Sequence, residues 1–409
     1  MRETSMKNQL LHTPEGVRDI YNLECERKLV IQDKLHSLIR TYGYRDIQTP
    51  TFEFFDIFNK ERGSVISKEM FKFIDREGNT LVLRPDITPS IARCAAKYYM
   101  DEKMPLRFCY MGNTFINNSS YQGRLKETTQ LGCELIGANT PVADGEMIAI
   151  IIRCMLEAGL TKFQVELGEV EFFRGLMEEA GIEEDVQIKI RDLIERKNFF
   201  GVEELLLEAG IEEEKRNRIL KLQELFGTAE KLSEAKVLAR NSRSLEAINR
   251  LEQVYEILKA CHLEQYVSFE LGMLGKYKYY TGVIFKAYTY GTGEMVVTGG
   301  RYDSLLQQFG KQAASIGFAI NIDQLITALS RQKLLPEKQA EGIFLLYQPE
   351  VQMDAVLFAA NYQKQGITVE LIQKDPEIKL EEYLQYATKL SRKELYYLSG
   401  GTPVVYPLG

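Results

Sequence analysis

The stretch 105–137, PLRFCYMGNTFINNSSYQGRLKETTQLGCELIG, is the most informative part of the chain about its fold. The segments 107–115 and 128–137 are rich in aromatic and β-branched residues, so they predict two strands. The polar segment 116–127 between them predicts a connecting loop. This pair of strands is the starting point for the rest of the core.

Helix and strand patterns alternate around this pair. Upstream, 24–42 has apolar residues at helical spacing, 71–84 predicts a hairpin, and a helix is expected to start near Ser90, after two prolines. Downstream, 143–159 predicts another helix, and 162–170 alternates apolar and polar residues as a half-buried strand does. Mixed patterns of this kind predict an α+β fold.

A change in composition and residue spacing divides the predicted core. Segment 171–262 is rich in paired charges, with Leu and Ile at helical spacing, and predicts a charged, all-helical insertion. Strand patterns return at 267–274, 281–290 and 293–300. The sequence therefore predicts one core over 1–330 that the insertion interrupts.

A second, smaller unit is predicted at the end of the chain. The stretch 331–340, RQKLLPEKQA, has the composition of a linker. Segment 341–409 follows a β-α-β-α-β pattern, which predicts a small parallel α/β unit.

Composition narrows the function classes. The 51 basic and 58 acidic residues give a net charge of −7, which argues against a protein that coats nucleic acid. The six cysteines are scattered without a CxxC pair, and reduced, buried thiols are expected. None of the three histidines has metal-ligand spacing, so no metal site is predicted.

Targeting and membrane segments are not expected either. The first residues are polar and lack an apolar core of the kind that signal peptides have. No stretch approaches 18 apolar residues, so a membrane span is not predicted. We expect a soluble protein of the cytoplasm.

Four separated segments, in the same order, resemble the core of class II aminoacyl-tRNA synthetases, and specifically histidyl-tRNA synthetase. They are PEGVRDI (14–20) with GYRDIQTPTFE (43–53), LRPDITPS (83–90), the stretch 105–137, and YYTGVIF (279–285) through GGRYDSLLQQFG (299–310) to IGFAINIDQL (316–325). The resemblance covers about 14–330 and implies an antiparallel sheet flanked by helices. It also implies that 341–409 is a truncated anticodon-binding domain.

The resemblance further implies a pocket for L-histidine. The positions that match the family's pocket are Asp86, Thr88, Gln130, Glu134, Tyr279 and Tyr280. Asp86, Thr88 and Gln130 offer acceptors for an α-ammonium group, and Glu134 with Tyr280 can address the two ring nitrogens of an imidazole. Asp86 is one methylene shorter than the glutamate of the synthetases, so its contact is expected to differ.

Each of these residue types also has an ordinary structural interpretation. Asp86 after a proline is typical of a turn or helix-capping carboxylate, and the Tyr279–Tyr280 pair is typical of buried sheet aromatics. Arg301 in GGRYD is expected to have a structural role at the pocket lining, and Arg124 is expected to be exposed.

The arginines that synthetases use for amino-acid activation are absent at the matching positions, which are Ile116, Gly275 and Gln324. Cations there would stabilise the negative charge that develops on phosphorus, and loss of one such donor costs roughly 10²–10³ in rate. Lys276 or Lys278 could replace one charge but lacks the planar fork of arginine. We therefore expect no adenylation, and no catalytic residues or cofactor.

A synthetase-like chain that keeps the histidine pocket and lacks activation chemistry resembles the regulatory subunit of ATP phosphoribosyltransferase. This resemblance implies a non-catalytic protein of histidine biosynthesis that activates the short-form catalytic subunit and mediates feedback inhibition by L-histidine. It implies a homodimer through motif 1, the dimer motif of the class II fold, which GYRDIQTPTFE (43–53) matches with Pro50 and Glu53. It further implies that this dimer is part of a hetero-octamer, without tRNA as a partner. The alternatives are a histidyl-tRNA synthetase or another synthetase-like paralogue that binds histidine.

Overall fold

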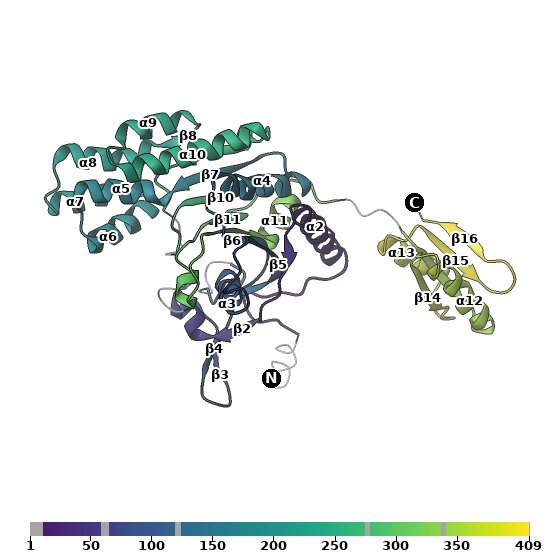
Figure 1. Cartoon of the computed structure of the whole chain (residues 1–409). Helices are drawn as coiled ribbons and strands as arrows, with labels where there is room; N and C mark the ends of the chain where they lie inside the picture. The colour runs from purple at the N-terminus through teal and green to yellow at the C-terminus, as the bar shows by residue number, and fades with distance from the viewer. Residues whose placement is uncertain (1–10, 59–64, 119–123, 275–278, 337–340, 409) are drawn as a thin grey trace, which may run out of the picture. The chain divides into compact units, whose positions relative to one another are not determined.

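The computed structural model describes residues 11–58, 65–118, 124–274, 279–336 and 341–408. The chain divides into two compact units, Met1–Leu335 and Pro336–Gly409. Figure 1 shows the helices and strands of both units, coloured along the chain from the N- to the C-terminus.

The first unit is built on a large sheet with the strand order β1-β5-β6-β12-β11-β10-β7-β9-β8. Its strands are β1 (Arg45–Asp46), β5 (Leu106–Phe115), β6 (Glu127–Ile136), β7 (Phe163–Glu169), β8 (Phe226–Gly227), β9 (Val267–Glu270), β10 (Val283–Thr289), β11 (Val297–Arg301) and β12 (Ser315–Asn321). The central neighbours pair antiparallel, whereas β1 pairs parallel with β5 and β7 pairs parallel with β9. The α+β fold with a mainly antiparallel core sheet is confirmed.

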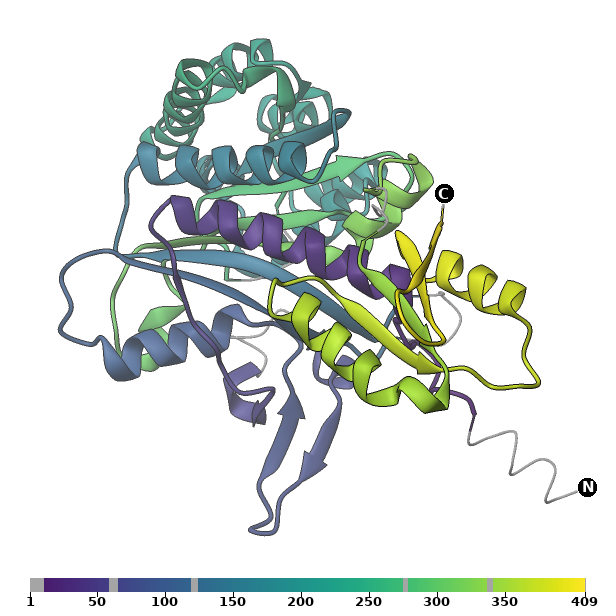
Figure 2. The same ribbon diagram turned by 90° about the vertical axis from the view of Figure 1, so that its right-hand side faces the viewer.

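Helices cover both faces of this sheet. They are α2 (Asn22–Thr41), α3 (Thr88–Tyr98), α4 (Pro141–Glu157) and α11 (Ile322–Arg331), with the short 3₁₀ helix η6 (Leu306–Phe309). Figure 2 shows α2 along the sheet, where it contacts α4 and α11. The opposite face packs against α3 and η6 through a separate hydrophobic cluster.

The alternation of β6 assigns its side chains to these two faces. Leu131, Cys133 and Leu135 belong to the hydrophobic core shared with α2 and α4. Gln130 and Glu134 therefore point to the opposite face, because successive strand residues alternate. This face holds the candidate site.

The start of α3 differs from the sequence prediction. The helix begins at Thr88, two residues before the predicted start at Ser90, with Pro89 in its first turn. Proline fits there because the first backbone N–H groups of a helix have no partner within the helix. The earlier start places Thr88 at the first helical position.

A small antiparallel sheet lies outside the large one, with the order β2 (Phe52–Phe54), β4 (Thr80–Leu83), β3 (Lys72–Ile74). Its β3–β4 pair confirms the predicted hairpin. Val82 is fully buried, whereas Phe52 and Phe73 form an edge-to-face pair on the exposed side.

The insertion contains α5 (Val170–Ala180), α6 (Glu184–Glu195), α7 (Phe199–Glu208), α8 (Glu213–Leu220), α9 (Glu230–Leu238) and α10 (Ser242–Ala260). The prediction of an all-helical segment is wrong at one point, because Phe226–Gly227 forms β8 and extends the large sheet next to β9. Two residues are too few to leave a periodic pattern in the sequence. Figure 1 shows the insertion helices gathered at the β8 end of the sheet.

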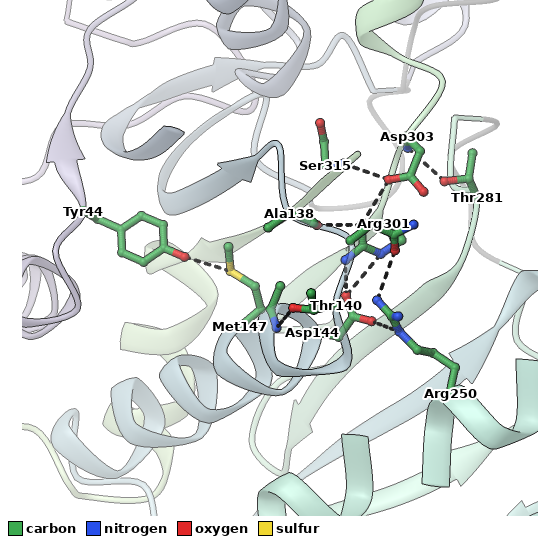
Figure 3. Close-up of polar contacts among 12 residues, drawn as sticks. Tyr44, Ala138, Thr140, Asp144, Met147, Arg250, Thr281, Arg301, Asp303 and Ser315 are labelled. Atoms are coloured by element: carbon green, nitrogen blue, oxygen red, sulfur yellow. Dashed lines mark hydrogen bonds and ion pairs between the residues drawn. The ribbon is translucent and has the colours of Figure 1, made fainter. Parts of the chain in front are cut away.

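A buried ion network joins the insertion to the core (Figure 3). Asp144 of α4 is fully buried and accepts hydrogen bonds from Arg301 of β11 and from Arg250 of α10, at 3.1 and 2.6 Å for the two Nε atoms. Arg301 also binds Asp303 and the carbonyl oxygen of Ala138. The network thus fixes α4, α10 and the end of β11 relative to one another.

The second unit has a sheet with the order β14 (Val369–Gln373), β13 (Ile343–Tyr347), β15 (Glu394–Leu398), β16 (Val404–Pro407). Its helices are α12 (Gln352–Gln363) and α13 (Leu380–Lys389), and each packs in a different hydrophobic cluster. The predicted parallel pairs of β13 are present, but β16 pairs antiparallel with β15, so the sheet is mixed.

Among the helices of the described ranges, none combines the length and the apolar character that a membrane span requires.

Candidate functional site

The residues that match the histidine pocket of synthetases line one cavity on the α3 face of the large sheet. All six lie there: Asp86, Thr88, Gln130, Glu134, Tyr279 and Tyr280. The structure thus brings together six residues from three separated segments of the sequence.

Glu134 lies at the bottom of this cavity, where its side chain is 1% exposed. Thr88 donates a hydrogen bond from Oγ1 to Glu134 Oε1 at 2.6 Å, and Tyr302 donates from its hydroxyl to Oε2 at 2.5 Å. Burial raises the pKa of Glu134 to about 8, against the two hydrogen bonds, which favour the charged form. The carboxyl group therefore holds a proton at neutral pH.

Asp86 forms the rim of the cavity next to the start of α3. Its Oδ1 accepts the backbone N–H of Thr88 at 3.1 Å, and its Oδ2 accepts the hydroxyl of Tyr279 at 3.0 Å. Asp86 is thus a turn carboxylate and a pocket-lining carboxylate at once, so the structural and the functional interpretations of this residue are compatible.

Gln130 supplies an acceptor on the strand that carries Glu134. Its Oε1 is buried and has no hydrogen-bond partner among the described residues. A buried carbonyl oxygen without a donor costs free energy, of the order of 1–3 kcal/mol. A ligand with an N–H group would relieve this cost.

Two paired glycines keep the α3 face clear where β12 and then β11 follow β6 in the sheet. A Cβ at Gly317 would lie 1.6 Å from Glu134 Oε2, and one at Gly300 would lie 3.0 Å from Tyr280 Cδ1. Any side chain at Gly317 would therefore occupy the position of the Glu134 carboxylate. The cavity volume is about 20 Å³, room for about one water molecule, so a larger ligand requires lining side chains to move.

Tyr302 is the pocket residue that sequence reasoning missed. It belongs to the GGRYD string, in which Arg301 was expected at the pocket lining, but within the described chain Tyr302 lines the cavity and Arg301 does not. The expectation for Arg301 is wrong because alternation along the strand turns this side chain toward Asp144 instead. The same alternation, applied from Gly300, which pairs with Gly317 on the cavity face, could have identified Tyr302.

The positions matching the synthetase arginines lie in a different environment. Ile116 packs against the small cluster of Phe58, Val65, Met70 and Val82. Gln324 receives a hydrogen bond from Thr292 and donates one to Glu294 at 3.2 Å. Gly275, with Lys276 and Lys278, lies outside the described residues.

Arg124 is a further residue of this region. We call the region the nucleotide side and define it by Ile116, Arg124, Thr292, Glu294 and Gln324. Its Nε pairs with Glu294 Oε1 at 2.6 Å, and about half of its side chain is exposed, as expected. The cation of Arg124 is therefore already paired within the chain.

Comparison with known proteins gives consistent matches. The family model described as histidyl-tRNA synthetase matches residues 16–325. A protein of Acetivibrio thermocellus named ATP phosphoribosyltransferase regulatory subunit is 42% identical over 361 residues, which are 88% of this chain and 86% of the relative. A relative with the same name from Ruminiclostridium cellulolyticum is 39% identical, over 89% of this chain and 87% of its own.

Solved structures agree with this fold. A crystal structure from Bacillus halodurans, described as an ATP phosphoribosyltransferase regulatory subunit/histidyl-tRNA synthetase, has a TM-score of 0.85 and 30% identity, covering 96% of this chain and 99% of that one. Histidyl-tRNA synthetase from Nostoc shares the fold at 19% identity, with a TM-score of 0.78 over 97% of each chain. The chain therefore belongs to the family of ATP phosphoribosyltransferase regulatory subunits, which has the class II synthetase fold.

Proposed function

We propose that this chain is a non-catalytic regulatory subunit in histidine biosynthesis, which activates a short-form ATP phosphoribosyltransferase and makes it sensitive to L-histidine. Family membership supports the regulatory role. The observation that carries the histidine assignment is the cavity in which Glu134, Gln130 and Asp86 converge.

The chemistry of the cavity suits a histidine zwitterion. Asp86 and the Gln130 carbonyl oxygen are acceptors suited to an α-ammonium group. Glu134, which holds a proton at neutral pH, can share that proton with an imidazole nitrogen, and Tyr280 can address the other nitrogen. Thr88 orients Glu134 rather than the ammonium group, because its hydroxyl proton is used in their hydrogen bond.

The absence of activation chemistry is supported by the nucleotide side. Ile116 packs in an apolar cluster, and Gln324 is an uncharged partner of Glu294. Neither can replace an arginine at a phosphate, because phosphoryl chemistry requires fixed positive charge. We infer that the chain binds histidine without converting it.

A homodimer through motif 1 within a hetero-octamer is part of the proposal. Helix α2 exposes Leu29 and Val30, and the small sheet exposes Phe52, Phe54 and Ile74, each by more than half. Large apolar side chains exposed in this way are typical of a contact surface. A second copy of this chain suits them because motif 1 pairs the class II fold.

The decisive experiment measures phosphoribosyl-ATP formation by the matching short catalytic subunit, with and without this chain and with and without L-histidine. The proposal predicts activation by the chain and inhibition by histidine only when the chain is present. A competent catalytic subunit that does not respond to the chain would contradict the regulatory role. Histidine-dependent ATP–pyrophosphate exchange by the chain alone would instead indicate a histidyl-tRNA synthetase.

A further inference from the structure

Three side chains with metal-binding atoms converge on the other face of the large sheet, away from the histidine cavity. They are His36 of α2, Asp46 of β1 and Cys109 of β5. Cys109 is far from the other two in sequence, and the parallel pairing of β1 with β5 places Asp46 directly beside it. Histidine spacing could not reveal this cluster, because only tertiary structure brings its members together.

The donor atoms have nearly the separations of a tetrahedral site. Cys109 Sγ lies 3.4 Å from Asp46 Oδ1 and 3.7 Å from His36 Nε2. For zinc with bonds of about 2.3 Å to sulfur and about 2.0 Å to nitrogen or oxygen, tetrahedral angles require about 3.6 Å between sulfur and either lighter atom. His36 Nε2 and Asp46 Oδ1 are 2.5 Å apart and must separate by about 0.8 Å to reach the tetrahedral distance of about 3.3 Å.

The arrangement is unlike a nucleophilic triad. In a triad the thiol and the carboxylate contact opposite nitrogens of the imidazole ring, so that the ring relays a proton between them. Here Cys109 and Asp46 both face the same nitrogen, Nε2 of His36. Three ligand atoms that converge on one point are instead typical of a cation site.

Burial and charge also suit a metal ion. The Cys109 side chain is fully buried, whereas His36 is 21% and Asp46 44% exposed, which leaves an entry path from solvent. A thiolate and a carboxylate together balance the charge of a divalent ion. Arg40 binds the other oxygen, Oδ2, of Asp46 and orients the carboxylate, as outer partners of metal ligands commonly do.

We propose that His36, Asp46 and Cys109 form a zinc site that ties α2 and β1 to β5. The mixture of thiolate, imidazole and carboxylate favours Zn²⁺ over Mg²⁺ or Ca²⁺, which prefer oxygen ligands. Three protein ligands leave one position for water. The site would fix the start of the sheet against α2, the helix that also carries part of the proposed dimer surface.

The experiment uses the full-length chain, freed of metal with a chelator and titrated with Zn²⁺, and with Co²⁺ as a spectroscopic probe. We expect one bound equivalent and a thiolate-to-cobalt charge-transfer band in the near ultraviolet. C109S should abolish the band, and H36Q should weaken Zn²⁺ binding by roughly a hundred-fold or more. H36Q changes a half-buried residue, so an unaltered melting temperature without metal would show that this variant folds.

C261S and H262Q are the matched controls, because Cys261 is an exposed thiol next to a histidine, where adventitious binding would occur. Both should bind Zn²⁺ like the parent chain. The proposal is overturned if the parent chain shows no thiolate band, if C109S keeps it, or if C261S rather than C109S removes it.

Discussion

The proposed histidine cavity (Asp86, Thr88, Gln130, Glu134, Tyr279, Tyr280 and Tyr302) and the nucleotide side lie at the same sheet, but their polar groups are satisfied in opposite ways. Among the described residues of the cavity, Gln130 Oε1 is buried without a hydrogen-bond partner, and Glu134 accepts hydrogen bonds from the neutral hydroxyls of Thr88 and Tyr302. On the nucleotide side, Glu294 is paired with Arg124 and Gln324. Buried polar groups without a partner favour binding of a ligand that can satisfy them. Polar groups that already bond to one another do not favour such binding.

The largest effect is expected from E134Q, which removes the central acid of the cavity with little change in shape. The amide at position 134 has no proton to share with the imidazole of histidine. Histidine affinity should therefore fall roughly a hundred-fold. Isothermal titration calorimetry measures this directly. Q324A, on the nucleotide side, is the control and should bind histidine normally; equal losses in both variants would remove the distinction between the two regions.

The glycine at 317 gives a purely steric test. G317A places a Cβ 1.6 Å from Glu134 Oε2, and displacement of this carboxylate should weaken histidine binding more than about ten-fold. G293A is the matched control, since nothing lies within 4 Å of a Cβ there. Unchanged affinity in G317A, with a folded protein by circular dichroism, would show that histidine binds elsewhere.

The proton on Glu134 predicts a pH effect with a definite sign. If the complex holds one proton between Glu134 and the imidazole, binding must take up a proton once free Glu134 has lost its own above its pKa of about 8. The histidine affinity of the parent chain divided by that of E134Q should therefore fall about ten-fold between pH 7 and pH 9. The ratio cancels the titration of histidine's own amino group. A flat ratio would mean that the complex needs only the carboxylate.

The smallest effect is expected from restoring arginines on the nucleotide side. In I116R/Q324R the arginine at 324 meets Glu294, which would pair with it, so no histidine-dependent ATP–pyrophosphate exchange should be detectable. An exchange rate clearly above that of the parent chain would show that the two missing arginines are all that prevents activation of histidine. Adding E294Q to this variant tests whether Glu294 is the obstacle.

Much of this architecture could be predicted from the sequence. The strands around 105–137 and the helix over 24–42 were predicted from local periodicity. The six cavity residues were predicted from the resemblance of their motifs to those of histidyl-tRNA synthetase. The role of Thr88 as a donor to Glu134 was not, since it depends on the exact start of α3.

What the sequence missed depends on contacts between distant segments. The two residues of β8 become a strand only because β9 lies beside them, and β16 was hidden in a short run after two glycines. The direction of Arg301 depends on Asp144, which lies on a separate helix. Arginine is usually exposed, so nothing in the sequence indicated that Arg301 is buried.

The shared core of sheet and insertion has a consequence for how the molecule can move. Side chains of α6, α7 and α10 belong to the same hydrophobic cluster as those of β6 and α4. The insertion therefore melts with the sheet as one cooperative unit and cannot open as an independent lid. A conformational change at the cavity can therefore be transmitted through the insertion only as a rigid-body displacement of its helices. The C-terminal unit has hydrophobic clusters of its own and can unfold separately.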